Sequence, residues 1–264
     1  MKKSALKLTL AFLLAVCTLT GCGDSSSSDK DSGKESKVET TTAAEKTTEE
    51  STTEEAATEG STEEKTTTSK DTDASPAAEG TDFKRGVVEN NVYTNEFAGI
   101  KLTAPDGWKF ADDETILKMM NLGAETAYSD NADLVKKIVE QATISDALCM
   151  NSTSTQNITI TYENLNKNIV LNTDTTADDY YAILEAQLSA VPTIKYTKTS
   201  GPETIQMAGK DFLKAVFKAE MNNIELEQAY YLRREGDFIL LISCTAYNMD
   251  DDISTFENYF SAAE

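Results

Sequence analysis

Histidine is absent from the 264 residues of this chain. Imidazole is the usual base beside a serine or cysteine nucleophile, a common ligand of transition metals and the side chain that titrates closest to neutral pH. Its absence therefore excludes Ser-His and Cys-His catalytic pairs, histidine metal ligands and a histidine pH switch.

Positive charge is also scarce. The chain has 24 Lys and Arg residues against 45 Asp and Glu residues, which gives a formal net charge of -21 at pH 7. Such a chain is repelled by the phosphates of nucleic acids and by anionic lipid head groups. We therefore expect no nucleic-acid partner and no basic patch that attaches the protein to a membrane surface.

A hydrophobic run long enough to span a membrane is missing as well. The apolar stretch at residues 8–19 is interrupted by threonines and Cys17, and three lysines precede it. A spanning helix needs about 18 or more apolar residues, whereas a positive start and a shorter apolar core are typical of a signal peptide. Residues 1–21 are therefore predicted to be removed from the mature protein.

The predicted signal peptide ends in Leu19-Thr20-Gly21-Cys22. This run resembles the lipobox of bacterial lipoprotein precursors, in which the chain is cleaved after the glycine and the cysteine receives a diacylglycerol. The resemblance implies cleavage between Gly21 and Cys22 and a lipid anchor, with acyl chains such as palmitate, on Cys22. Two acyl chains hold a protein at a bilayer stably, whereas one binds only marginally. The alternative is an ordinary secretory signal with an incidental cysteine.

The residues after Cys22 bear on the location of the mature protein. Gly23 comes first, and an aspartate appears only at Asp24. An aspartate directly after the lipidated cysteine would, in cells with two membranes, indicate retention in the inner one, and that signal is missing. The long hydrophilic spacer resembles that of Gram-positive lipoproteins. We expect the protein on the outer, extracytoplasmic face of the cell membrane of a Gram-positive host.

The spacer, residues 22–82, has little that could form a hydrophobic core. From residue 23 it contains 17 acidic and 6 basic residues, no aromatic residue, and Val38 as its only branched aliphatic residue. A segment of this composition cannot offset its ordering entropy and is predicted to be a disordered, acidic, Ser/Thr/Glu-rich tether. A coil of 60 residues would average about 40 to 45 Å between its ends. Its hydroxyls could carry O-linked sugar, although a plain solvated linker is the simpler interpretation.

From Phe83 onward, aromatic and aliphatic residues appear at regular spacing. Residues 83–264 are predicted to form a single domain, because about 180 residues suffice for one buried core. The domain is acidic by itself, with 28 acidic and 15 basic residues. Its periodicity predicts helices and short-turn antiparallel strands. The predicted helices are 112–120, 131–141, 176–191 and one beginning at 250–252 that bears Ile253, Phe256 and Phe260. The predicted strands are 92–94, 100–104, 147–150, 158–164, 194–198, 204–207, 212–219, 224–233 and 238–247.

Two of these predictions are specific enough to test the layout. Residues 238–242 are apolar at every position, which is typical of a central strand covered on both faces. In the helix at 176–191, Tyr180, Leu184, Leu188 and Val191 form one apolar stripe. The predicted fold class is α/β of the α+β kind, with an antiparallel sheet of about six or more strands sandwiched by helices.

A family resemblance rests on two stretches. The run Tyr93-Thr94-Asn95-Glu96-Phe97-Ala98-Gly99-Ile100-Lys101-Leu102, followed by Pro105-Asp106-Gly107-Trp108, is similar to the opening of PsbP-like domains. The closing strands from Glu227 to Tyr247 and the terminal helix resemble the end of such domains. The resemblance implies an α/β/α sandwich over roughly residues 87–263. The photosystem extrinsic subunit and the Ran-binding Mog protein, which belong to this family, are binding modules, but none of their metal or partner residues carries over to this chain.

The remaining candidate residues have structural interpretations. Trp108, the only tryptophan, could be an exposed ligand platform, but a tryptophan at a turn that enters the core favours a structural plug. The acidic runs 112–114 and 250–252 favour helix starts, and the second lacks the spacing and the glycine of a calcium loop. We therefore expect no metal site, no cofactor and no catalytic residue.

Cys149 and Cys244 both lie on predicted strands and survive processing. An extracellular compartment permits a disulfide between them, which would stabilise the domain by about 2 to 4 kcal/mol. Two buried free thiols are the alternative, because the sequence does not show whether the two strands are adjacent.

The sequence thus predicts a lipoprotein with a non-enzymatic interaction or binding domain, accessory to an envelope process. Its expected partners are the membrane, through the diacylglycerol on Cys22, and an unidentified envelope protein. The alternative is a binder of small ligands or cell-wall glycan, or a weak hydrolase. Carboxylates are abundant in the domain, but no cluster of aromatic residues marks a sugar-binding cleft.

Overall fold

The structure is a computed structural model, and it describes residues 83–127, 140–168, 171–191, 193–221, 223–247 and 252–263. The predicted signal peptide with Gly21 and Cys22 and the predicted tether lie outside the described residues. Most of the predicted helix at 131–141 and the pair Asp250 and Asp251 also lie outside them.

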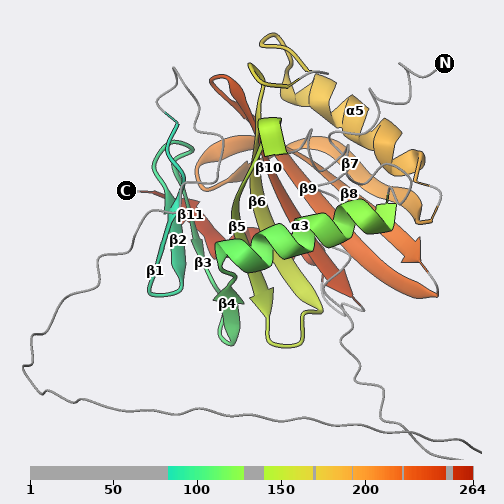
Figure 1. The fold of residues 1–264 in the computed structure, drawn as a ribbon, viewed down its shortest axis with the longest axis horizontal. Coiled ribbons are helices and arrows are strands. Elements are labelled where there is room, and N and C mark those ends of the chain that lie inside the picture. Colours follow the sequence, from blue (N-terminus) through green and yellow to red (C-terminus); the bar gives the residue numbers. More distant parts are fainter. Residues whose placement is uncertain are drawn as a thin grey trace, which may run out of the picture. The chain divides into compact units, whose positions relative to one another are not determined.

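The larger of two sheets has seven strands, all antiparallel, in the order β4-β5-β6-β10-β9-β8-β7 (Figure 1). The strands are β4 (Trp108–Phe110), β5 (Thr143–Asn151), β6 (Gln156–Asn164), β7 (Lys195–Met207), β8 (Lys210–Met221), β9 (Ile224–Glu235) and β10 (Phe238–Tyr247). β10 lies in the middle of the sheet, and residues 238–242 have no exposed surface. The predicted central strand is confirmed.

A second, smaller sheet has the order β1-β2-β3-β11 and is also antiparallel. Its strands are β1 (Val87–Glu89), β2 (Val92–Asn95), β3 (Ile100–Thr103) and β11 (Phe260–Ala262). β2 and β3 form the hairpin that their alternating pattern predicts. β1 and β11 were not predicted, and β11 brings the end of the domain beside its beginning.

Helix α5 (Ala177–Ser189) covers one face of the seven-stranded sheet (Figure 1). Thr176 caps it through a capping box, in which its side chain accepts from the backbone of Asp179 and the Asp179 side chain accepts from the backbone of Thr176. Tyr180, Leu184 and Leu188 of the predicted stripe are buried in one cluster with the apolar residues of β8, β9 and β10. Helix α3 (Asp113–Ala127) contacts β5.

The small sheet and the 3-10 helix η1 (Ile253–Tyr259) cover the opposite face. Tyr93, Ile100 and Leu102 of the small sheet and Phe256 of η1 pack in one cluster with the apolar residues of β6 and β10. The α+β class and the antiparallel sheet of more than six strands are therefore confirmed. The prediction that helices cover both faces is corrected for this face. A second sheet and a 3-10 helix cover it instead of α-helices.

Several predicted elements also differ from the structure in type or extent. The terminal helix is a 3-10 helix, and Phe260 belongs to β11 instead. The two strands predicted at 194–198 and 204–207 are one strand, β7, with register shifts around Ser200 and Glu203. Because a bulge lets a strand continue through an irregular stretch, the intervening Gly201 and Pro202 do not end it.

Cys149 and Cys244 are both free and buried. Each is the cross-strand partner of Ile158, Cys149 in β5 and Cys244 in β10, so that β6 runs between them. Neighbouring strands lie about 4.8 Å apart, which places the two Cα atoms well beyond the roughly 7 Å limit of a disulfide. Of the two alternatives that the sequence left open, the structure has the two buried free thiols and not the disulfide.

Candidate functional site

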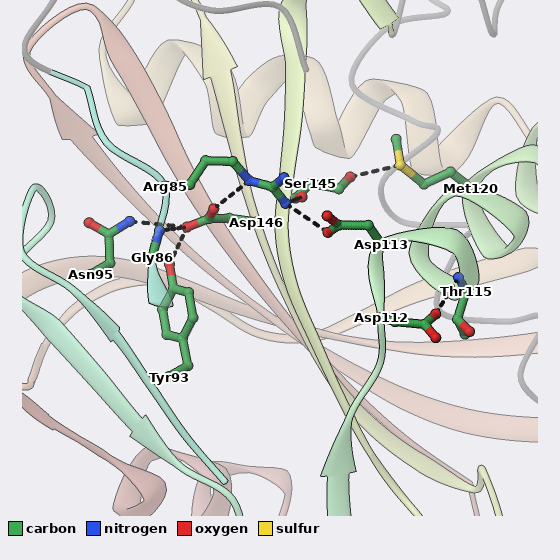
Figure 2. Close-up of polar contacts among 10 residues, drawn as sticks. All are labelled: Arg85, Gly86, Tyr93, Asn95, Asp112, Asp113, Thr115, Met120, Ser145 and Asp146. Atoms are coloured by element: carbon green, nitrogen blue, oxygen red, sulfur yellow. Dashed lines mark hydrogen bonds and ion pairs between the residues drawn. The ribbon is translucent and has the colours of Figure 1, made fainter. Parts of the chain in front are cut away.

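The carboxylate of Asp146 is the centre of a buried network of hydrogen bonds. It lies in β5 at a register shift between Ser145 and Ala147, and its side chain has 0% exposure. Its Oδ2 accepts hydrogen bonds from Gly86 N at 2.9 Å, Tyr93 Oη at 2.5 Å and Asn95 Nδ2 at 3.0 Å. Its Oδ1 accepts from Arg85 Nε at 3.1 Å (Figure 2). We name Asp146 and these four donors the Asp146 clasp.

Local sequence explains why the clasp forms. The bulge in β5 re-aims one residue of the strand, so an acidic side chain in an otherwise apolar stretch turns toward the lead-in to β1. Gly86 is required because a Cβ at this position would lie 2.1 Å from Cε2 of the Tyr93 ring. A buried carboxylate needs compensating donors, and the clasp supplies four.

Arg85 joins the clasp to the surface of the domain. Its Nη2 donates to the backbone oxygen of Ser145 at 2.8 Å and to Asp113 Oδ1 at 3.3 Å. Asp113 is in the first turn of α3, and its side chain is 78% exposed. Burial, and next the charge of Asp146, raise the pKa of the Tyr93 hydroxyl well above its usual value, so Tyr93 remains a donor. The clasp is thus a fixed junction of β1, β2, β5 and α3.

Phe83 fixes the chain immediately before the clasp. Its ring stacks on Phe238 with centroids 4.7 Å apart, and it meets Tyr162 and Phe97 edge-on at 5.1 and 5.2 Å. Such aromatic pairs contribute roughly 0.5 to 1.5 kcal/mol each beyond the area they bury. Phe83, two residues before Arg85, is therefore packed against the core of the domain.

A cavity of about 570 Å³ lies beside the clasp. This volume is within the range of roughly 300 to 1,000 Å³ that is usual for ligand sites. The lining residues come from the outward face of the small sheet and the segments next to it: Lys84, Arg85, Val87, Glu89, Asn90, Val92, Thr94, Glu96 and Lys101. Val87 pairs with Thr94, and Thr94 pairs with Lys101, so these three side chains form one cross-strand row.

The cavity is lined by charged groups of both signs. The side chains of Lys84, Lys101, Glu89 and Glu96 form no ion pair or hydrogen bond with other described residues. Arg85, in contrast, is directed into the clasp. A ligand in the cavity would meet ammonium groups, carboxylates and two valine side chains, and Arg85 is the one clasp residue in the cavity lining.

Two further buried ionic groups hold elements in place. Lys214, with 8% of its side chain exposed, donates to Ser254 Oγ and Glu257 Oε1, each at 2.6 Å, and so fastens η1 to β8. Glu163 of β6 accepts from Thr143 Oγ1 at 2.8 Å and Asn168 Nδ2 at 3.1 Å. Burial raises the pKa of Glu163 to about 7.

Trp108, Asp112 and Asp252 have the structural roles that the sequence predicted for them. Trp108 is buried and meets Phe256 edge-on at 5.6 Å, which confirms the plug. Asp112 accepts from Thr115 N at 2.8 Å, and Asp252 accepts from Ser254 N at 2.9 Å, so both begin helices. Hydrogen bonds from the side chain and then from the backbone of Thr115 lower the pKa of the Asp112 carboxyl, and bonds from the backbone and then the side chain of Ser254 lower that of Asp252. Within the described part of the chain, no group of acidic or cysteine residues has the arrangement of a metal site, and no helix is long and apolar enough to cross a membrane.

Sequence reasoning missed the Asp146 clasp. A signal was present, because Asp146 is the only charged residue in the otherwise largely apolar stretch 142–150. A lone acidic residue in a buried strand implies a dedicated partner. The partners lie 51 to 61 residues away, so their identity could not be read from local pattern.

No protein-family model and no curated protein matches this chain. Among solved structures, a protein from Bacteroides thetaiotaomicron is similar with 10% identity and a TM-score of 0.35 over 66% of this chain and 48% of that one. LpqN, involved in cell envelope biogenesis of Mycobacterium tuberculosis, is similar with 9% identity and a TM-score of 0.36 over 62% of this chain and 83% of LpqN. The chain thus spans about half the length of the Bacteroides protein. At these scores neither structure assigns a fold family or a function, and the PsbP-like resemblance stays a prediction.

Proposed function

We propose that this chain is a lipid-anchored extracytoplasmic lipoprotein whose folded domain is a non-enzymatic interaction module in an envelope process. The observation that carries this proposal is the position of the cavity. Lys84 and Arg85, which line it, come directly after the segment predicted to lead to the lipid on Cys22. A partner bound in the cavity would be held at the point where the tether joins the domain.

The hydrogen bonding of the clasp supports binding rather than catalysis. A general base or nucleophile needs a lone pair that is free to meet the substrate. Oδ2 of Asp146 already accepts three hydrogen bonds, and Oδ1 accepts from a guanidinium. Asp146 therefore acts as a rigid support for the cavity wall. The PsbP-like resemblance agrees with this proposal, since the relatives named above are binding modules.

Photo-cross-linking in the producing cells tests the proposal. A photoreactive amino acid replaces Thr94, which lines the cavity, in the full-length protein. The control position is Lys218, an exposed residue of β8 outside the cavity. We expect one defined protein adduct from position 94 and none from position 218. Equal adducts from both positions, or none from position 94, would refute the cavity as a partner site.

A further inference from the structure

We infer that the partner docks as an extended polypeptide strand on the free edge of β1, with an acidic side chain directed toward Lys84 and Lys101. This inference rests on the proposed function and specifies the chemistry of its partner. An added strand obtains affinity from main-chain hydrogen bonds and specificity from pockets for alternate side chains.

β1 is an edge strand whose outer side has no neighbour among the described strands. All three of its residues are exposed, and Val87 and Val88 are 57% and 44% exposed. The only other exposed large hydrophobic residues in the described ranges are Leu117 and Ile224. Two adjacent exposed valines on an unpaired strand form an edge that is open to pairing.

The edge of the larger sheet at β7 is protected by comparison. β7 carries Lys195 and Lys198, contains Pro202, and has two register shifts along its pairing with β8. Charged residues, proline and bulges are the devices by which proteins blunt edge strands. β1 has neither lysine nor proline, and only its last residue, Glu89, is charged.

The clasp holds this edge ready for a partner. Gly86 N is bonded to Asp146, and the backbone oxygen of Lys84 accepts a bond from Asn95 Nδ2 at 3.3 Å. The backbone that leads into β1 is therefore fixed before binding, which reduces the entropy lost on association.

Charge selects the kind of strand that fits. Side chains of an added strand would alternate between the two sides of the small sheet, and every second one would face the cavity next to Val87 and Glu89. The ammonium groups of Lys84 and Lys101 have no acidic partner among the described residues, so an acidic side chain that points toward them, and away from Glu89 and Glu96, supplies the missing partner.

The test uses the full-length protein with a photoreactive amino acid at Glu89 and a proline at Val87 or Val88. In an antiparallel ladder successive residues direct their N–H groups alternately toward and away from the neighbouring strand, so one of these prolines removes an outward N–H and leaves the β1–β2 pairing intact. That variant is recognised by its wild-type melting temperature. We expect its adduct yield to fall about tenfold, corresponding to ~1.4 kcal/mol.

A charge variant provides a second measurement that does not depend on the proline. Lys101→Glu should lower the adduct yield from Glu89, whereas Lys218→Glu should leave it unchanged. Strand docking is overturned if the proline variant with normal melting temperature keeps its yield, or if Lys101→Glu has no effect. An adduct with the mass of two copies of this chain overturns the assignment of a different partner. An adduct at Thr94 without one at Glu89 refutes strand docking alone and leaves the proposed function standing.

Discussion

Asp146 and Asp113 both pair with Arg85, but only Asp146 is buried. In Asp146→Asn one acceptor oxygen becomes a donor, which then faces donors such as Tyr93 Oη or Gly86 N. Leaving a buried donor or acceptor without its partner costs about 1 to 3 kcal/mol. We expect a loss of this size in the free energy of unfolding, measured by urea denaturation. Asp113→Asn is the matched control and should change it by less than about 0.5 kcal/mol. Similar losses in both variants would contradict the role assigned to the clasp.

Glu163 makes domain stability depend on pH. Burial raises its pKa from 4.5 to about 7, so the folded state favours the protonated form. Its favourable contribution is complete below pH 4.5 and is lost as the pH rises through about 7. Above that pH, the buried carboxylate costs on the order of 3 kcal/mol relative to its protonated form.

Glu163→Gln should therefore stabilise the domain at pH 8 and change little at pH 4.5. Urea unfolding of both proteins at the two pH values measures the difference. Glu225→Gln is the control, because Glu225 lies exposed on β9. A stabilisation by Glu163→Gln that is equal at both pH values would contradict an effect of ionisation.

At the scale of residues, the sequence indicated roles that depend on near neighbours in the chain. Trp108 follows a turn, and Asp112 and Asp252 each cap the segment two or three residues ahead, so local pattern was enough. The clasp depends on the bulge in β5. It also depends on side-chain hydrogen bonds to Asp146 of β5 from Tyr93 and Asn95 of β2, more than 50 residues earlier in the sequence. The helix and strand propensities of single residues do not predict such long-range contacts.

Among the elements, α5 depends on its capping box. Thr176→Ala removes the side-chain acceptor for Asp179 N, 3.1 Å away, and should lower the free energy of unfolding by about 1 kcal/mol. Asp178→Ala, in the same turn, is the control and should cost less, since Asp178 contributes through the helix dipole alone. Thermal unfolding followed by circular dichroism measures both changes. Equal losses would mean that the cap is not formed.

The elements predicted correctly are those with a strong local period. The β2–β3 hairpin, α5 and β10 show the alternation, stripe or continuous apolar run of their class. β1 and β11 have only three residues each, too few to show a period, and β11 pairs with β3 more than 150 residues earlier. The two thiols illustrate the same limit, because strand order, not strand identity, decides whether they can meet.

For the whole molecule, the proposed anchor can be tested through two cysteines. Cys22→Ala should abolish incorporation of a palmitate analogue and either release the protein into the medium or leave it unprocessed, because the thiol that accepts the lipid is gone. Cys17→Ala is the control and should be processed normally, since Cys17 lies inside the predicted signal peptide. A Cys22→Ala protein that stays in the membrane fraction with normal processing would refute lipid anchoring.

The packing of Phe83 and the clasp has a mechanical consequence. If the anchor pulls on residue 82 and a partner holds β1, tension runs through the seven residues from Phe83 to Glu89. The stacked Phe83 ring and the Arg85–Asp146 pair brace this short path against the core. The seven-stranded sheet lies outside the path, so movement between membrane and partner would leave the core folded, and the force that extracts Phe83 would set the strength of the link.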